Sequence, residues 1–130
     1  MQLHSVLDDI EIRGIKTGML YDAENTRRVV RKLKAHYGDA ANIPPLVVDP
    51  VAVSTSGHTL LHPEAIDVMI EELFPLATLI TPNKPETELL LSRRGDSASI
   101  ETLEDMIAAS EKLLAYGSKA ILVKIGRAHV

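Results

Sequence analysis

Residues 46–58 read LVVDPVAVSTSGH, and this stretch decides the fold predicted for the chain. Three apolar residues, two of them β-branched, run directly into an acidic residue and a proline, a pattern typical of a buried strand that ends abruptly. A carboxylate at the end of such a strand is costly to desolvate unless a cation, a hydroxyl group or a helix N-terminus lies nearby. We therefore expect Asp49 to lie at a functional edge of a sheet.

A second segment has the same form. Residues 78–86 read TLITPNKPE, a short apolar strand followed by a polar tip and an acidic residue. Apolar and polar residues alternate over 10–20, as in a strand, and residues 119–124 form a last apolar strand. Apolar residues at helical spacing predict helices over 22–37, 63–75, 85–91 and 99–117. Asp22 and Ser99 are the expected N-caps of the first and last of these helices.

Strands that alternate with helices predict an α/β fold, with a parallel sheet in the middle and helices on both faces, in three layers. In open parallel sheets the ligand lies outside the carboxyl ends of the strands. The polar tips of three predicted strands would meet at that edge, and they carry Asp49, Asn83 with Glu86, and Lys124.

The composition narrows the class of protein. With 130 residues and 45% hydrophobic content, the chain can bury one core and is expected to form one domain. A net charge of −4 and an aromatic content of 3% disfavour nucleic acid as a partner. The absence of cysteine fits the cytosol, and the apolar runs are too short for a membrane span. We expect a soluble cytosolic protein with no membrane partner.

The predicted strand tips carry the side chains that suggest a chemistry. Asp49, Asn83 and Glu86 would supply the oxygen ligands that Mg²⁺ prefers, and such a cation would shield phosphoryl charge during transfer. Lys124 could steady a phosphate. A structural interpretation competes with this one, in which Asn83 is a turn residue and Glu86 a first-turn partner of the helix dipole. Lys124 would then be a solvated lysine at a strand end, and the residues alone leave both interpretations open.

Two weaker signals have simpler interpretations. Ser54, Ser56 and His58 contain a hydroxyl nucleophile and a base, but no Gly-x-Ser-x-Gly elbow accompanies them, which favours a hydroxyl-rich loop. The first predicted helix carries a basic cluster, which we interpret as its solvated face. The cluster consists of Arg27, Arg28, Arg31, Lys32 and Lys34.

Four ordered blocks carry a family resemblance. They are IKTGML (15–20), VDPV (48–51) with STSGH (54–58), LITPNKPETE (79–88) and AILVK (120–124). Together they resemble the hydroxymethylpyrimidine/phosphomethylpyrimidine kinases of thiamine biosynthesis, in the ribokinase-like superfamily. The resemblance implies phosphorylation of 4-amino-5-hydroxymethyl-2-methylpyrimidine, and then of its monophosphate, with ATP and Mg²⁺. The alternatives are a pyridoxal kinase, which shares the fold and the Thr-Pro-Asn turn, and a non-catalytic nucleotide-binding module.

The resemblance also implies roles for single residues. It implies that Asn83 and Lys124 bind the nucleotide and its phosphates. Asp49 and Glu86 would bind the metal, and Met19 and Val51 would contact the pyrimidine. In the family, the base and the anion hole belong to a Gly-Thr-Gly-Cys segment that this sequence does not contain. No catalytic residue is therefore predicted here, and we expect no turnover from the free chain.

The resemblance sets the expected domain limits. Residues 1–124 are predicted to be the central part of a kinase domain whose sheet is incomplete at both ends. Residues 125–130 read IGRAHV where the family continues Gly-Gly-His, and they translate a common sequencing adapter. We expect these six residues to be a non-native tail. For the longer parent enzyme we allow a homodimer, which the sequence itself does not report.

Overall fold

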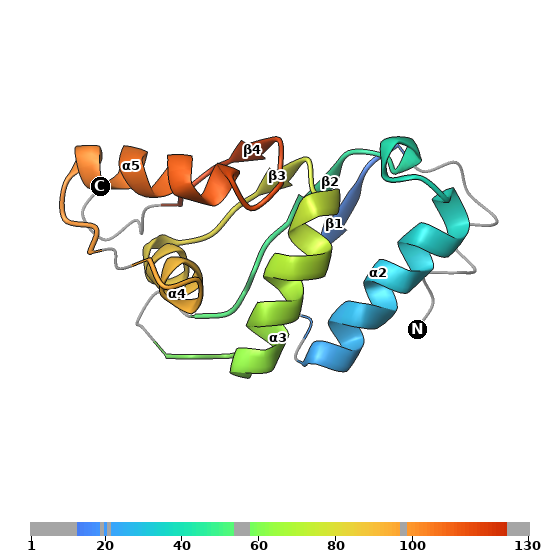
Figure 1. Ribbon diagram of the computed structural model, residues 1–130, viewed down its shortest axis with the longest axis horizontal. Helices are drawn as coiled ribbons and strands as arrows, with labels where there is room; N and C mark the ends of the chain where they lie inside the picture. Colours follow the sequence, from blue (N-terminus) through green and yellow to red (C-terminus); the bar gives the residue numbers. More distant parts are fainter. Residues whose placement is uncertain (1–12, 19, 21, 54–57, 97–98, 125–130) are drawn as a thin grey trace.

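A computed structural model describes residues 13–18, 20, 22–53, 58–96 and 99–124. It contains a parallel four-stranded sheet in the order β1-β2-β3-β4, as Figure 1 shows. The strands are β1 (Ile15–Thr17), β2 (Leu46–Val48), β3 (Leu79–Ile80) and β4 (Ala120–Ile121). The predicted α/β class with a parallel sheet is confirmed. β1 is shorter than the alternation over 10–20 predicted, and residues 10–12 lie outside the described part.

Helices connect each strand to the next. The crossovers are α2 (Ala23–Tyr37) with the short turn η1 (Ala40–Asn42), then α3 (Pro63–Val68) with the π-helical turn η2 (Met69–Leu73) and the 3₁₀ turn η3 (Phe74–Leu76), then α4 (Lys84–Arg93) and α5 (Leu103–Leu114). Each crossover steps to the neighbouring strand in the same direction, and parallel crossovers are right-handed. The described helices therefore lie against one face of the sheet.

Burial of the strand residues agrees with this arrangement. Leu46, Val48 and Ile80 are fully buried on the helix-covered face. Val47 and Leu79 are register partners that point to the opposite face, where they are only half-buried. The sequence predicts helices on both faces of the sheet, but the helices among the described residues form a layer on one face only. The core lies between the sheet and the helices, with Phe74 and Leu33 among its largest fully buried side chains.

Helix α2 begins and ends where the sequence predicts. Asp22 is the N-cap, and its Oδ1 accepts a hydrogen bond from Asn25 N at 2.8 Å. The helix ends at Gly38, whose φ of 77° is a conformation that glycine adopts without steric cost. The basic cluster of α2 is exposed, which confirms its interpretation as a solvated face.

The start of α5 corrects one sequence prediction. Thr102, not Ser99, is the N-cap, because Thr102 Oγ1 accepts from Asp105 N while the Asp105 carboxylate accepts from Thr102 N. This reciprocal capping box satisfies donors at both ends of the first turn, which Ser99 cannot do from three residues upstream.

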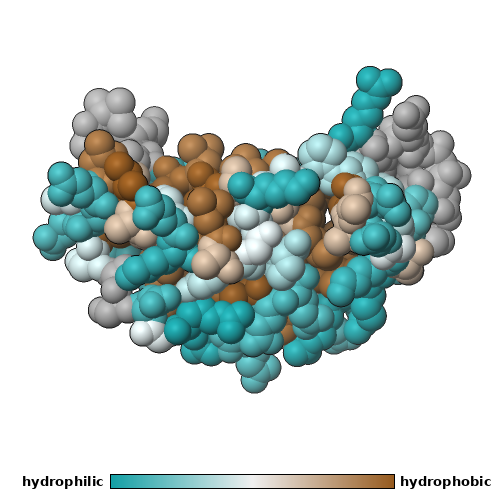
Figure 2. All heavy atoms as spheres, turned by 45° about the horizontal axis from the view of Figure 1, so that its top comes forward, coloured by the Kyte–Doolittle hydropathy of each residue, from teal (hydrophilic) through white to brown (hydrophobic). Residues whose placement is uncertain are grey.

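The apolar residues of α5 divide between two environments. Leu113 is buried, whereas Leu103 and Ile107 are 70% and 52% exposed. Leu122, just after β4, is also exposed. In the view of Figure 2, hydrophobic residues gather toward the α5 end of the molecule and in the hollow of its surface. In the part of the chain that the structure describes, no helix is long and apolar enough to cross a membrane.

Candidate active site at the strand tips

Three strand tips meet at the carboxyl edge of the sheet, as the sequence predicts. Asp49 follows β2, Asn83 follows β3, and Lys124 lies three residues after the end of β4. Lys124 N donates to Pro82 O at 2.7 Å, and an isolated parallel bridge pairs Asn83 with Lys124. Lys124 Nζ donates to both carboxylate oxygens of Asp49 at 3.3 Å. The fold thus brings residues from three chain segments into one site.

The pair between Asp49 and Lys124 is accessible to solvent. The Asp49 side chain is 21% exposed and the Lys124 side chain 45%. Ion pairs this exposed contribute only about 0–1 kcal/mol to stability. The pair can therefore separate at little energetic cost, which leaves the Asp49 carboxylate free to bind a cation and the Lys124 ammonium group free to bind an anion.

Glu86 lies deep beneath this edge, with 1% of its surface exposed. Its Oε2 accepts hydrogen bonds from Ala52 N at 2.6 Å and Val53 N at 3.1 Å. Its Oε1 accepts from Asn83 N at 2.9 Å. The structural interpretation of Glu86 as a first-turn residue of α4 is therefore correct. Its role at a metal stays a prediction.

Asn83 is the N-cap of α4. Its Oδ1 accepts from Glu86 N at 2.8 Å, which completes a capping box, and its Nδ2 donates to Val53 O at 2.8 Å. The turn interpretation of Asn83 is thus correct. The positive end of the α4 dipole also lies here, a feature that favours negatively charged ligands. The role of Asn83 toward phosphate stays a prediction.

Of the two residues predicted to face the pyrimidine, Val51 and Met19, the structure describes only Val51. Val51 is half-buried at the tip that follows β2, and its φ of 46° places it in the left-handed region. This conformation is a genuine outlier for a β-branched residue. Met19 lies outside the described residues, as do Ser54 and Ser56.

The donor set at the edge fits a magnesium ion that is held mainly by phosphate and water. Mg²⁺ commonly takes one or two protein carboxylates and fills its other positions with waters and substrate phosphates. Asp49 offers such a carboxylate, since its partner Lys124 is an exposed side chain. Within the described ranges no group of three or more His, Cys, Asp or Glu residues is arranged to hold a metal.

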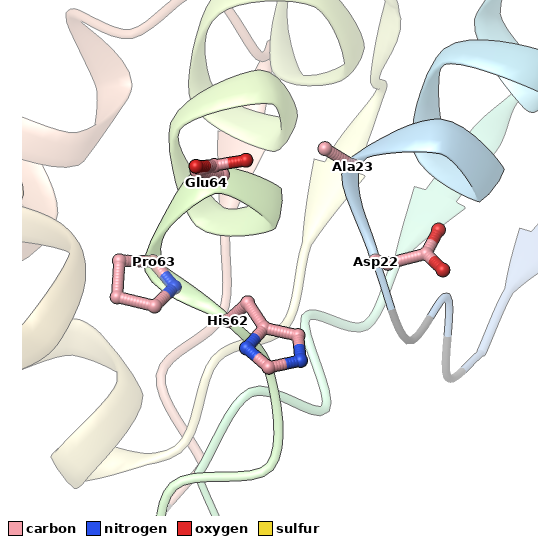
Figure 3. A pocket seen from close by; sticks show the side chains of 5 residues that line it. All are labelled: Asp22, Ala23, His62, Pro63 and Glu64. Atoms are coloured by element: carbon pink, nitrogen blue, oxygen red, sulfur yellow. The ribbon is translucent and has the colours of Figure 1, made fainter.

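A separate small cavity lies between the N-termini of α2 and α3. Its volume is about 300 Å³. Figure 3 shows His62 and Pro63 at the start of α3, with the Asp22 carboxylate directed away from the His62 ring. Asp22, Ala23, His62, Pro63 and Glu64 line it, so that it includes no predicted site residue.

Sequence reasoning missed the backbone groups that Glu86 binds. The N–H groups of Ala52 and Val53 are 34 and 33 residues away from Glu86 along the chain. No local pattern reports a contact between a carboxylate and such distant amides. Only the family resemblance points to Val51 beside them, since nothing in a valine indicates a positive φ.

Comparison with known proteins gives one consistent family. A family profile described as "Phosphomethylpyrimidine kinase" matches residues 1–130. The hydroxymethylpyrimidine/phosphomethylpyrimidine kinase of Rhizobium meliloti is 37% identical over 127 residues, which cover 96% of this chain and 43% of that protein.

Solved structures agree. The crystal structure of phosphomethylpyrimidine kinase from Clostridium difficile 630 is similar with a TM-score of 0.81 and 38% identity, over 97% of this chain and 50% of that one. Pyridoxal kinase of Bacillus subtilis, in an ADP complex, has a TM-score of 0.79 and 30% identity, over 97% of this chain and 44% of that one. The chain thus spans half or less of the length of these proteins.

Proposed function

Because this chain belongs to the phosphomethylpyrimidine kinase family, we propose that the protein containing it phosphorylates 4-amino-5-hydroxymethyl-2-methylpyrimidine with ATP, and then phosphorylates the monophosphate. The observation that supports the proposal most strongly is the convergence of Asp49, Asn83 and Lys124 at the carboxyl edge of the sheet. A ligand of an open parallel sheet binds at this edge.

Each predicted site residue has a proposed task. Asp49 would hold Mg²⁺ directly, and Glu86, buried behind it with both carboxylate oxygens bound by backbone N–H groups, would support that metal site without contacting the ion. When bound, the ion shields the charge of the transferring phosphoryl group. Lys124 leaves Asp49 and pairs with a phosphate, while Asn83 holds the N-terminus of α4 toward the nucleotide. Positive groups placed in advance around a phosphoryl group stabilise charge in the transition state.

The pyrimidine would lie beside Val51 and Met19. In the proposed reaction the hydroxymethyl oxygen of the substrate forms a bond to the γ-phosphorus, the bond from that phosphorus to the β–γ bridging oxygen breaks, and ADP leaves. The hydroxyl proton must pass to a base, and none of the predicted site residues of this chain is assigned that task. We therefore propose that the free chain lacks turnover.

The function is testable in a chimera. Residues 1–124 replace the matching segment of the Rhizobium meliloti kinase, and phosphorylation is followed with the hydroxymethylpyrimidine and with pyridoxal in parallel. We expect the pyrimidine to be the better substrate by about tenfold or more, since a site built for one set of hydrogen-bonding groups rejects another. Faster phosphorylation of pyridoxal would favour the pyridoxal kinase alternative.

An inactive chimera needs a control, which is the same chimera rebuilt with the Rhizobium segment. If the rebuilt enzyme is active and the folded chimera phosphorylates neither compound, the proposed function is wrong and a nucleotide-binding module becomes the better interpretation. Retention of ATP by that inactive chimera would then be measured directly. A cytosolic location and a homodimeric assembly stay predictions.

A further inference from the structure

Both oxygens of the buried Glu86 carboxylate accept hydrogen bonds from backbone N–H groups. Its Oε2 receives the N–H groups of two consecutive residues, Ala52 at 2.6 Å and Val53 at 3.1 Å. Consecutive backbone N–H groups form a concave anion site, known as a nest, in several classes of phosphate-binding protein. In this chain a carboxylate from α4 fills the position that a bound anion would take.

Asn83 also forms a hydrogen bond to the backbone of this turn, at Val53. Its Nδ2 donates to Val53 O at 2.8 Å, while its Oδ1 accepts from Glu86 N. Val53 is therefore held at both its N–H and its C=O by the two residues of one Asn-x-x-Glu motif. A capping box by itself requires only bonds within the first turn of the helix. The bonds to Ala52 and Val53 are additional.

The turn that these bonds hold is strained. Val51 has a φ of 46°, and a left-handed conformation costs an L-residue with a β-carbon free energy that its surroundings must offset. The strained residue directly precedes the two amides that Glu86 binds. Ala52 O also accepts from Leu60 N at 2.6 Å, and Val53 pairs with Thr59. The held segment is thus the base of the loop between β2 and α3.

We propose that Asn83 and Glu86 are positioning residues. Their hydrogen bonds to the backbone of Ala52 and Val53, which we call the clasp, fix Val51 and the neighbouring Asp49 at the edge of the sheet. Glu86 then acts on the site through the backbone of Ala52 and Val53. The inference rests on the proposed function for its consequence, the placement of Asp49 and Val51 toward ligands. The clasp itself does not depend on which ligand is bound.

The test uses the 130-residue chain without substrate, so that its outcome is independent of the kinase proposal. Amide hydrogen exchange and amide chemical shifts are measured by NMR for Ala52 and Val53. A charge-assisted bond as short as that of Ala52 is expected to protect its amide and shift its proton resonance downfield. Exchange of both amides at the rate of unprotected backbone would overturn the proposal with no variant needed.

A variant then assigns the protection to Glu86. In Glu86→Gln a neutral amide replaces the carboxylate, and exchange at Ala52 and Val53 is expected to accelerate about tenfold or more, because bonds to charged groups are the stronger ones. Glu88→Gln is the matched control. Glu88 lies on the same helix and accepts from the Ile100 amide at 2.9 Å, so its replacement should leave Ala52 and Val53 unchanged.

A double-mutant cycle with Val51→Gly separates a clasp from simple helix capping. Glycine removes the left-handed penalty, so Val51→Gly is expected to lower the unfolding equilibrium constant roughly threefold to tenfold after its own entropic cost. In the Glu86→Gln background the turn can relax, and the gain is expected to disappear.

Four results decide the inference. Equal effects of Val51→Gly in both backgrounds, or unchanged exchange in Glu86→Gln, would show that Glu86 does not hold the turn. If Glu86→Gln alone does not fold, Glu86→Asp replaces it: the shorter side chain weakens the bonds to Ala52 and Val53, and faster exchange of both amides supports the clasp. Exchange of both amides in Glu86→Asp at the rate seen in the parent chain and in Glu88→Gln contradicts it.

Discussion

Lys124 Nζ lies 3.3 Å from both carboxylate oxygens of Asp49, although 75 residues separate the two along the chain. The contact joins the tips of β2 and β4 across β3, whose own tip carries Asn83. A cationic and an anionic group therefore stand together at the edge where a parallel sheet binds its ligand. Both are exposed enough to meet one.

The first prediction concerns Lys124→Met in the chimera. The change is expected to raise the KM for ATP about tenfold, because an ammonium group beside phosphate is lost. Thermal stability should hardly change, since exposed ion pairs contribute about 0–1 kcal/mol. Lys119→Met, which removes an exposed lysine just before β4, is the control and should leave the KM unaltered. An unchanged KM in Lys124→Met would remove this residue from the nucleotide site.

A second prediction follows from the N-cap of α5. Thr102→Ala is expected to lower the free energy of unfolding by about 1 kcal/mol, since Thr102 Oγ1 then no longer accepts from Asp105 N. Ser99→Ala should change it by less than about 0.5 kcal/mol because Ser99 is exposed and is not the N-cap. Urea denaturation measures both, and the reverse order of effects would contradict the assigned cap.

This helix start also shows where local sequence signals reach their limit. Asp22 and Gly38 bound α2 correctly because each acts within one turn of its own helix. The prediction of Ser99 as the N-cap is wrong because α5 has two candidate hydroxyl residues near its start. Of these two, only Thr102 is followed three positions later by an acidic residue. The π-helical turn at 69–73 carries no comparable signal.

The candidate site likewise has a part that the sequence predicts and a part that it does not. The strand tips at Asp49, Asn83 and Lys124 could be predicted, because a short apolar run followed by polar residues marks a strand end. The buried state of Glu86 could not, since its hydrogen bonds to Ala52 and Val53 depend on how two strands are placed side by side. Tertiary contacts of this kind leave no periodicity in the sequence.

A third prediction compares two leucines of α5. Leu113→Ala is expected to destabilise the chain by about 2–5 kcal/mol, because a fully packed side chain is replaced by a cavity. Leu103→Ala should cost less than about 0.5 kcal/mol, since Leu103 is 70% exposed. Urea denaturation of the two variants gives both values. Equal costs would mean that another part of the protein covers Leu103.

A fourth prediction is a pH dependence. The Arg93 guanidinium donates to both carboxylate oxygens of Asp67, and this hydrogen bonding lowers the pKa of Asp67 below its usual 3.8. A carboxyl whose pKa is lower in the folded state stabilises the protein above its unfolded pKa, and this stabilisation is lost as the pH falls through the folded pKa.

The lowered pKa of Asp67 determines how the stability of Asp67→Asn should depend on pH. The variant should melt slightly below the parent chain near pH 7, and the difference should shrink as the pH is lowered below about 3.8. The effect is small because Asp67 and Arg93 are both more than one-third exposed. Thermal melts of both proteins between pH 2 and 7 measure it. A difference that grows toward low pH would contradict the pairing.

The most direct measurement is the Mg²⁺ dependence of pyrimidine phosphorylation in the chimera, with and without Asp49→Asn. If Asp49 holds the ion at the strand tips, the Mg²⁺ concentration for half-maximal rate should rise about tenfold or more in the variant, because an amide is a much poorer ligand for this hard cation than a carboxylate. Glu88→Gln should leave it unchanged. Superimposable Mg²⁺ curves for the chimera and its Asp49→Asn variant would contradict the proposed site.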